Sequence, residues 1–375
     1  MPYEPRAWQA LERGERPRTD AVAEAFFHLA RLEERGAGSA RDRHGRFSAA
    51  ASCVDPLDPP LELLRRELGA APPRWRGAPF AVALTHDVDV PRRWTRVGLR
   101  GGAARIKGAL ARREARVAVS EARALATVPV HVVRRTDPWW TFERVTSEER
   151  ERGARSTFFL LAAHGHRADG PAPASYERLR PRLAATIRAG GAEVGLHGSF
   201  TAADDLDRLA REKARLEELV GPVAGQRYHY LRVFPDRNLA PLARLGFRYD
   251  ASLGFADAPG FRAGLAQPFR PWDWTHDRPS ELVEIPLAVM DVTLGERRYL
   301  GLSAGEAERR LAPLLDAAAE RGGGFAILWH NAWFDARSFP GWGELYFRLI
   351  EGVQERGGVC LSAGELAEEA TRWLP

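Results

Sequence analysis

Acid and histidine side chains stand at the ends of three short apolar runs in this sequence. Carboxylate oxygens and imidazole nitrogens bind divalent metals of hard to borderline character, and the same groups act as acids and bases in catalysis. If the three runs end at one place, they predict a divalent metal site with acid and base groups beside it. The residues are Asp87 and Asp89 after the run 80–86, His197 after 192–196, and His330 after 325–329.

The apolar runs are typical of buried parallel strands. In a parallel barrel the C-terminal strand ends converge on one face, which brings together residues that are far apart in the sequence. From residue 80 onward such runs alternate with amphipathic stretches, the pattern of repeated βα units. We expect strands near 80–85, 156–161, 192–196, 226–231, 247–250, 282–286, 325–329 and 358–361, and helices over 176–189, 204–219, 240–245, 303–321 and 342–355.

Two architectures fit repeated βα units, a closed barrel and an open doubly wound sheet. No Gly-rich phosphate motif follows the first expected strand. Its absence from the sequence disfavours the nucleotide-binding form of the open sheet.

The two carboxylates at the end of the first run are separated by one residue. In an extended strand both would point to the same face, so that one holds a metal and the other accepts a proton from an attacking water. Two aspartates that cap a loop would give the same sequence pattern. The histidines at the ends of the other apolar runs favour a metal site over this alternative. His197 is well placed as a ligand, because one ring nitrogen binds metal while an acceptor holds the other. A buried structural histidine is the alternative.

His330 precedes a polar amide and two aromatic rings, an arrangement suited to a general acid at the rim of a pocket. A structural role is equally possible for the tryptophans beside it. Residues 227–232 add a further histidine, His229, and two arginines, of which Arg227 or Arg232 is expected to orient an acid such as Asp87. The candidates for the pocket lining are Trp272, Trp329, Asn331, Trp333 and Tyr230.

The composition is that of a globular protein. Of the 375 residues 45% are hydrophobic, which is ample material for a core. The two cysteines, Cys53 and Cys360, lie far apart, so neither a disulfide framework nor a cysteine zinc site is indicated. The N-terminus lacks a signal-peptide pattern and no run approaches a membrane span, so we expect a cytoplasmic location.

Residues 1–77 form an accessory region whose sequence pattern differs from that of the rest of the chain. We expect helices over 20–35 and 61–68, a linker over 70–77 and a domain boundary near 77, with residues 78–375 forming the larger unit.

The segment 92–135 interrupts the alternation of apolar runs and amphipathic stretches. It is an apparent insertion after the first strand and contains twelve Arg or Lys against two Glu. A basic amphipathic helix of this kind contacts anionic lipid, nucleic acid or an anionic polymer. An ordinary solvated helix is the other interpretation. Of the partners we expect an anionic lipid or membrane surface, with the protein peripheral to it, rather than nucleic acid.

The chain contains several ordered motifs: Thr85-His-Asp-Val-Asp89, Ser156-Thr-Phe-Phe-Leu160, Glu193-Val-Gly-Leu-His197, the segment 227–232 and Leu328-Trp-His-Asn331. Together they resemble the polysaccharide deacetylase family with the NodB homology domain, over about 80–375. Residues 249–256 and 260–264 narrow the resemblance to a bacterial branch with an extra N-terminal region, and residues 26–27, 33–34 and 42–47 resemble that region.

The resemblance implies a distorted (β/α) barrel of about seven strands with a smaller, mainly helical N-terminal region. It also implies a metal-dependent hydrolase, most simply a zinc enzyme, that removes N-acetyl groups from a carbohydrate. By position Asp87 would be the base, Asp89 and His197 metal ligands, Arg227 or Arg232 the residue that orients the base, and His330 the acid.

The sequence departs from the family pattern at the second motif. The family places a second histidine four residues after the first, and this chain has Thr201 there. A zinc site usually has three protein ligands, so His229, His166 or Thr201 would have to complete it. The first motif also separates its acids by one residue, which leaves the division of roles between Asp87 and Asp89 open. The alternative function is a catalytically weak or inactive carbohydrate-binding relative, with Trp272, Trp329 and Trp333 at its mouth.

Overall fold

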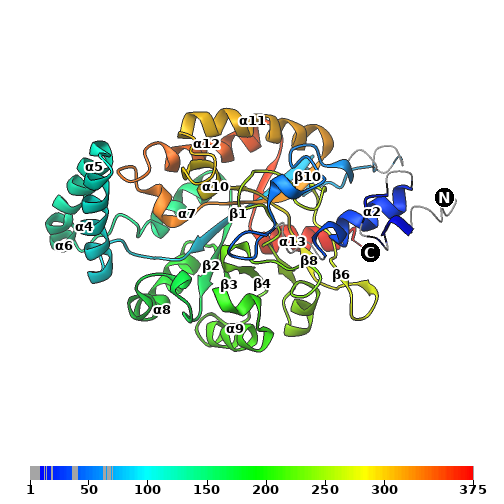
Figure 1. The fold of residues 1–375 in the computed structure, drawn as a ribbon, viewed down its shortest axis with the longest axis horizontal. Helices are drawn as coiled ribbons and strands as arrows, with labels where there is room; N and C mark the ends of the chain where they lie inside the picture. Colours follow the sequence, from blue (N-terminus) through cyan, green and yellow to red (C-terminus); the bar gives the residue numbers. More distant parts are fainter. Residues whose placement is uncertain are drawn as a thin grey trace.

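A curled sheet of parallel strands occupies the middle of the molecule, and helices cover its outer side (Figure 1). The computed structural model describes residues 9–11, 13, 15–17, 20–35, 41–61, 65, 69 and 71–374. Neighbouring strands follow the order β8-β5-β4-β3-β2-β1-β10-β9, and β11 pairs with the first half of β1. The strands are β1 (Phe80–Val88), β2 (Ser156–Leu161), β3 (Glu193–Gly198), β4 (Gly225–Tyr228), β5 (Tyr249–Asp250), β8 (Val283–Glu284), β9 (Leu287–Met290), β10 (Gly323–Leu328) and β11 (Val359–Leu361).

The chain itself brings the two edges of the sheet together. β8 and β9 are the edge strands, yet only Ile285 and Pro286 separate them in sequence. Three residue steps span at most about 11 Å, so the edges lie close and the sheet curls into a distorted barrel. The barrel expected from the sequence is therefore confirmed. The strand expected over 282–286 is the short strand β8, and β9, which follows it on the opposite edge, was not expected.

Alternate residues of the central strands face the inside and the outside of the barrel, as strand geometry requires. In β1, Ala81 and Ala83 belong to the inner apolar cluster, whereas Val82 and Leu84 belong to the outer one beneath the helices. β10 follows the same rule, with Ala326 and Leu328 inside.

Amphipathic helices pack on the outer side of the barrel. Asp205 caps α9 through the backbone N–H of Arg208, and Ser303 and Glu306 form a capping box at the start of α11. The region expected to be helical over 240–245 is a 3₁₀ helix, and α7 and α13 were not expected. The outer helices are α7 (Phe142–Glu151), α8 (Pro173–Ala189), α9 (Leu206–Val220), α11 (Ala304–Arg321) and α12 (Trp342–Glu355). Helix α13 (Ala363–Thr371) instead packs its buried residues against the inner cluster.

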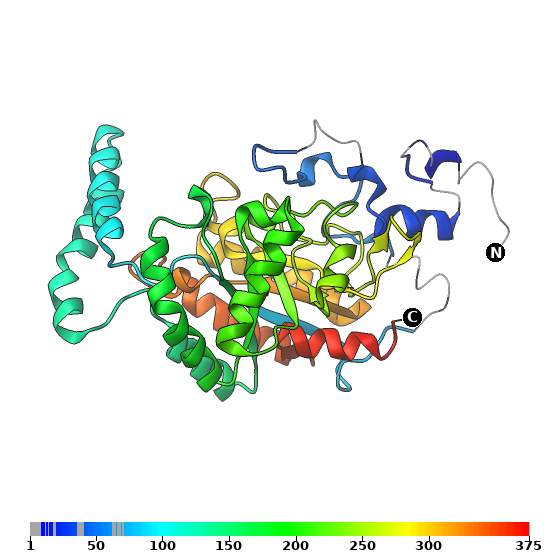
Figure 2. The ribbon, with the colours of Figure 1, turned by 90° about the horizontal axis from the view of Figure 1, so that it is seen from below.

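The described part of the N-terminal region lies against one side of the barrel (Figure 2). Helix α2 (Ala21–Leu29) begins after Asp20, whose carboxylate accepts the N–H groups of Val22 and Ala23. A 3₁₀ turn follows over Leu32–Glu34. Glu34 is buried and accepts from Nε of the barrel residue Arg262 at 2.9 Å. The second helix, expected over 61–68, falls largely outside the described residues.

The basic segment forms a separate arm at the opposite end of the molecule from the N-terminal region (Figures 1 and 2). It contains three helices rather than one: α4 (Arg96–Ala111), α5 (Ala115–Ala126) and α6 (Val128–Arg134). The arm leaves the barrel directly after β1, where the sequence places the insertion. Within the described residues, no helix is both long enough and apolar enough to cross a membrane.

Candidate functional site

The inward-facing positions of β1, β3 and β4 carry polar side chains at the carboxyl ends of the strands. The face of β1 that begins with Ala81 and Ala83 continues to Asp87 and Asp89. By the same alternation, His197 on β3 and Arg227 on β4 point inward. His229 follows immediately at the start of a 3₁₀ turn (His229–Leu231). The strand ends therefore bring together residues that are up to 142 positions apart, as between Thr85 and Arg227, which share a hydrogen bond.

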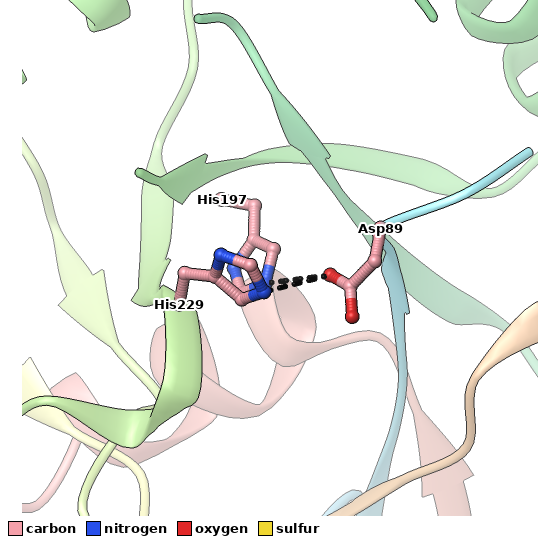
Figure 3. A group of neighbouring side chains, drawn as sticks. All are labelled: Asp89, His197 and His229. Atoms are coloured by element: carbon pink, nitrogen blue, oxygen red, sulfur yellow. Dashed lines mark ion pairs between the residues drawn. The ribbon is translucent and has the colours of Figure 1, made fainter. Parts of the chain in front are cut away.

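Asp89, His197 and His229 form a compact group at this end of the barrel (Figure 3). The Nε2 atoms of His197 and His229 lie 3.3 and 3.4 Å from Oδ1 of Asp89. Two ligands of a tetrahedral zinc ion, each about 2.0–2.1 Å from the metal, are separated by about 3.4 Å. Both distances therefore fit a metal site, and all three ligand atoms lie within 4.8 Å of one another, with His229 in the place of a third ligand.

Both histidines are held so that Nε2 is the free nitrogen. Nδ1 of His197 lies 2.9 Å from the carbonyl oxygen of Arg227, and Nδ1 of His229 lies 3.2 Å from Oδ1 of Asp169. Asp169 is itself fixed by the backbone N–H groups of Gly165, His166 and Phe200. Acceptors at Nδ1 of this kind set the ring orientation and the tautomer of metal-binding histidines.

Two of the three prospective ligand atoms have no hydrogen-bond partner although they are buried. These are Oδ1 of Asp89 and Nε2 of His197. Buried polar atoms are nearly always satisfied, because an orphaned one costs about 1–3 kcal/mol. One carboxylate oxygen and two imidazole nitrogens are a donor set that suits zinc. The residues present thus fit a divalent metal.

The charges of Asp89 and His229 stabilise each other. Burial would raise the pKa of Asp89, but the positive charge of His229 and the close approach of both imidazoles outweigh this effect and hold the pKa well below its usual range. Burial would lower the pKa of His229, yet Asp89 and Asp169 raise it to about 9. Without a cation, His229 therefore carries the positive charge that balances Asp89.

The backbone is strained directly beside His229. Tyr230 and Leu231 both have positive φ angles, 62° and 54°. Non-glycine residues rarely adopt this left-handed conformation, and bulky ones least of all. The strain redirects the chain at the end of β4, so that His229 and Tyr230 both line the pocket.

Asp87 has a different set of neighbours from Asp89. Arg227 donates from Nη1 to Oδ1 of Asp87 at 3.0 Å and to Oγ1 of Thr85 at 2.8 Å. Nε of Arg227 donates to the carbonyl oxygen of Ala251, which fixes the guanidinium. The side chain of Asp87 is only 5% exposed, against 31% for Asp89. Asp87 is thus oriented by arginine, with Nε2 of His197 3.6 Å from its Oδ2, whereas Asp89 faces both histidines.

His330 faces the group from the end of β10. Its Nδ1 lies 2.8 Å from Oδ1 of Asp291, and its Nε2 lies 3.8 Å from Oδ2 of Asp89. Burial would lower the pKa of His330, but Asp291, Asp89 and Asp87 raise it to about 10. A protonated imidazole beside the two aspartates can act as a general acid.

These residues line a cavity of about 250 Å³. Its floor contains Asp87, Asp89, His229 and His330, and its walls contain Tyr230, Asn331 and Trp333 from the sequence-predicted set. Nδ2 of Asn331 donates to the carbonyl oxygens of Val90 and Trp139, so this amide also holds the pocket rim together. Further wall residues are Arg46, Trp139, Glu296, Arg298 and Tyr299.

Arg232 and Trp329, which were predicted for the site, lie elsewhere. Arg232 donates to the carbonyl oxygens of His44 and Phe200 and pairs with Asp204, so Arg227 alone contacts Asp87. Trp329 occupies an outward position of β10 and packs against Trp342 and Tyr346. The alternation of β10 points Trp329 away from the barrel interior.

Trp272 and His166 are also outside the pocket. Trp272 lies in β6 (Trp272–Asp273) and packs edge-on against Phe26 of the N-terminal region. His166 stacks on Phe200 and accepts the backbone N–H of Ala168. Thr201 lies in a 3₁₀ turn (Phe200–Ala203), and its buried Oγ1 has no hydrogen-bond partner.

Sequence reasoning missed seven polar or aromatic residues of the site, which are Arg46, Trp139, Asp169, Asp291, Glu296, Arg298 and Tyr299. Asp291 had one available signal, since it directly follows an apolar run, as Asp87 does. Asp169 and Trp139 lie in connections, and Arg46 comes from the N-terminal hairpin of residues 41–47. Arg46 donates to Oδ2 of Asp42 and to the hydroxyl of Tyr299, which ties this hairpin to the pocket.

The fold is similar to that of two crystal structures of proteins assigned as polysaccharide deacetylases. The one from Mycobacterium smegmatis is 20% identical, with 81% of this chain and 94% of that chain covered and a TM-score of 0.50. The one from Pseudomonas aeruginosa PAO1 is 16% identical, with 81% and 95% covered and a TM-score of 0.51. No family model and no curated protein matches the sequence. At these identities the similarity confirms the barrel fold that the sequence motifs implied.

Proposed function

We propose that the protein is a divalent-metal-dependent hydrolase that removes N-acetyl groups from a carbohydrate. The observation that carries this proposal is the juxtaposition of a three-donor group with a separate acid and base in one pocket. The fold, which matches structures assigned as polysaccharide deacetylases, supports the substrate class. Zinc is the proposed metal, because one carboxylate and two imidazoles suit it.

The metal would be held by Asp89, His197 and His229. When bound, it supplies Lewis acidity toward an amide carbonyl and makes water a better nucleophile near neutral pH. It also takes over the charge balance at Asp89 that His229 provides in the structure described here. His229 would then be neutral, as metal-bound imidazoles are.

The proton transfers fall to two other residues. Asp87, oriented by Arg227, accepts the proton of the attacking water. His330, held in its protonated form by Asp291, donates a proton to the departing amine nitrogen, so that the sugar leaves as a neutral amine. Because the acid and the base are separate residues, each of them takes part in only one of the two proton transfers.

The sugar would lie between the pocket walls. Trp333, Trp139 and Tyr230 offer aromatic faces, and Asn331 fixes the backbone of the rim. The alternative, an inactive carbohydrate-binding relative, receives less support. It rested on a missing third ligand, whose place His229 fits, and on a mouth of three tryptophans, of which only Trp333 lines the pocket.

Acetate release from N-acetylated oligosaccharides, with parallel detection of the new amine, tests the proposal. The zinc-loaded protein should release one acetate per new amine, and His330→Ala should release it at least about 100-fold more slowly. Trp272→Ala, which lies outside the pocket, serves as the control and should keep full activity. Saccharide binding without any acetate release by the zinc-loaded protein would favour the inactive relative instead.

A further inference from the structure

The arm of residues 92–135 is a three-helix element that the proposed reaction does not use. Its helices α4 and α5 pack closely, because Gly102 leaves room for the side chain of Leu125. Ala109, Ala118 and Ala124 are buried between the helices. The arm therefore has a small core of its own, while most of its surface is turned away from the barrel (Figures 1 and 2).

The base of the arm is tied firmly to the barrel. Asp137 accepts the backbone N–H groups of Arg93 and Trp94, both at 2.9 Å. The guanidinium of Arg93 is 4% exposed and pairs with Asp335 of the barrel and with Glu121 of α5. These contacts position the arm relative to the pocket.

Exposed aliphatic side chains are concentrated on the arm. Among the described residues ten large hydrophobic side chains are exposed, and six of them belong to this segment of 44 residues. Val133 is 82% exposed, more than any of the other nine. Isolated exposed valines need no explanation, but such a concentration marks an interaction surface. The six are Val97, Leu110, Val119, Val130, Val132 and Val133.

The arm also concentrates positive charge. It holds twelve of the 55 Lys and Arg residues and two of the 50 Asp and Glu residues, so 43 basic and 48 acidic residues remain in the rest of the chain. The arm is thus strongly basic while the remainder is net acidic. Both of its acids are already paired, Glu121 with Arg93 and Arg105, and Glu114 with Arg112.

Most exposed cations of the arm have no acidic partner among the residues that the structure describes. No ion pair within the described part of the chain involves the following exposed residues: Arg96, Arg100, Lys107, Arg113, Arg123, Arg134 and Arg135. Unpaired cations interleaved with exposed aliphatic side chains complement an interface that is both anionic and apolar.

We propose that the arm is a docking element for an anionic lipid membrane surface. Anionic headgroups attract the unpaired cations, and the valine and leucine side chains enter the boundary between headgroups and acyl chains. Nucleic acid would satisfy the cations alone, since a phosphate backbone offers nothing to exposed aliphatic groups. The exposed valines of α6 therefore favour lipid over nucleic acid.

Docking would keep the pocket at the membrane. The arm leaves the barrel after Val90 and returns before Trp139, and both residues line the cavity. A saccharide at or near the lipid headgroups would thus be within reach of the pocket. The docking itself does not depend on the proposed reaction and can be measured without a substrate.

Sedimentation of the full-length protein with vesicles tests the proposal. Vesicles of phosphatidylcholine with phosphatidylglycerol should bind it, pure phosphatidylcholine should bind it weakly, and added salt should reduce binding. The charge variant R100Q/K107Q/R134Q should bind at least about tenfold more weakly. The apolar variant V132S/V133S, which changes only exposed side chains, should also bind several-fold more weakly.

The matched control is R278Q/R309Q/R310Q, which removes three exposed charges outside the arm and should leave vesicle binding unchanged. Absence of binding to anionic vesicles overturns the proposal, and so does full vesicle affinity in either arm variant. Binding of a duplex DNA fragment as tight as vesicle binding, and unaffected by V132S/V133S, would make the arm a nucleic-acid element and would equally overturn it.

Discussion

Two aspartates separated by one residue have different environments in this site. Asp87 is held by Arg227 and buried, whereas Asp89 faces His197 and His229. Both point into the barrel because they share one face of β1. The difference therefore comes from the neighbouring strands. It supports our proposal that Asp87 is the base and Asp89 a metal ligand, a division of roles that the sequence left open.

Asp87→Asn should separate chemistry from metal binding. The amide keeps the shape of the side chain and leaves the three proposed ligands in place, but it cannot accept a proton. We expect metal content near that of wild type and a fall in kcat of about 10²–10⁴-fold, measured by acetate release. A variant that loses its metal together with its activity would instead make Asp87 a ligand.

Asp291→Asn tests how His330 is kept protonated. The carboxylate of Asp291 accepts from both Nδ1 and the backbone N–H of His330. An amide supplies no negative charge there, so the pKa of His330 should fall and kcat should decrease by about 10–100-fold.

Asp273→Asn is a matched control for this variant, because Asp273 accepts from Nδ1 of His276 outside the pocket. It should leave kcat unchanged. Equal losses in the two variants would show that Asp291 acts through stability and not through His330.

The residues that could be predicted are those at strand ends. Asp87, Asp89, His197 and His330 each terminate an apolar run, and parallel strands bring such ends together. Asp291 directly follows the apolar run 287–290 and offered the same signal. Asp169 could not be predicted with the same ease, because its short 3₁₀ turn carries no periodic signal. Trp329 was placed wrongly since neither its residue type nor its neighbours reveal which face of β10 it occupies.

At the scale of elements, the N-terminal region is joined to the barrel by a buried ion network. Glu34 binds Arg262 of the barrel and also pairs with Arg31 and Arg41. The same region sends Arg46 into the pocket wall. The N-terminal region thus contributes a residue to the pocket wall. The boundary near residue 77 separates two segments of different sequence pattern, and the fold packs these segments together.

Stability should depend on pH through Glu34. Burial would raise the pKa of this carboxyl, but the positive charges of Arg262 and Arg31 outweigh the effect of burial and lower the pKa from 4.5 to about 2. A carboxyl with a depressed pKa stabilises the fold above its unfolded-state pKa, near 4.5, and this contribution disappears as the pH falls toward 2. The full contribution is about 3 kcal/mol.

Urea unfolding of wild type and Glu34→Gln between pH 7 and pH 3 measures this contribution. The variant should be less stable at pH 7 and should lose less stability on acidification than wild type. Parallel pH profiles for the two proteins would mean that Glu34 does not titrate in this range.

At the scale of the whole molecule, the topology assembles the site. The edges of the sheet meet through the β8 to β9 connection, so the ends of β1, β3, β4 and β10 surround one cavity. The repeated βα pattern predicted this convergence. The placement of β9 on the opposite edge from β8 and the three helices of the arm could not be predicted, because they depend on contacts between distant segments.

The central claim is that Asp89, His197 and His229 bind a divalent metal. Elemental analysis by mass spectrometry, on protein purified without chelator and incubated with zinc, tests it most directly. Wild type should hold about one equivalent, His229→Ala should hold little, and His276→Ala, at an exposed histidine outside the pocket, should match wild type. A wild type without metal, or a His229→Ala protein that retains a full equivalent, would contradict the account.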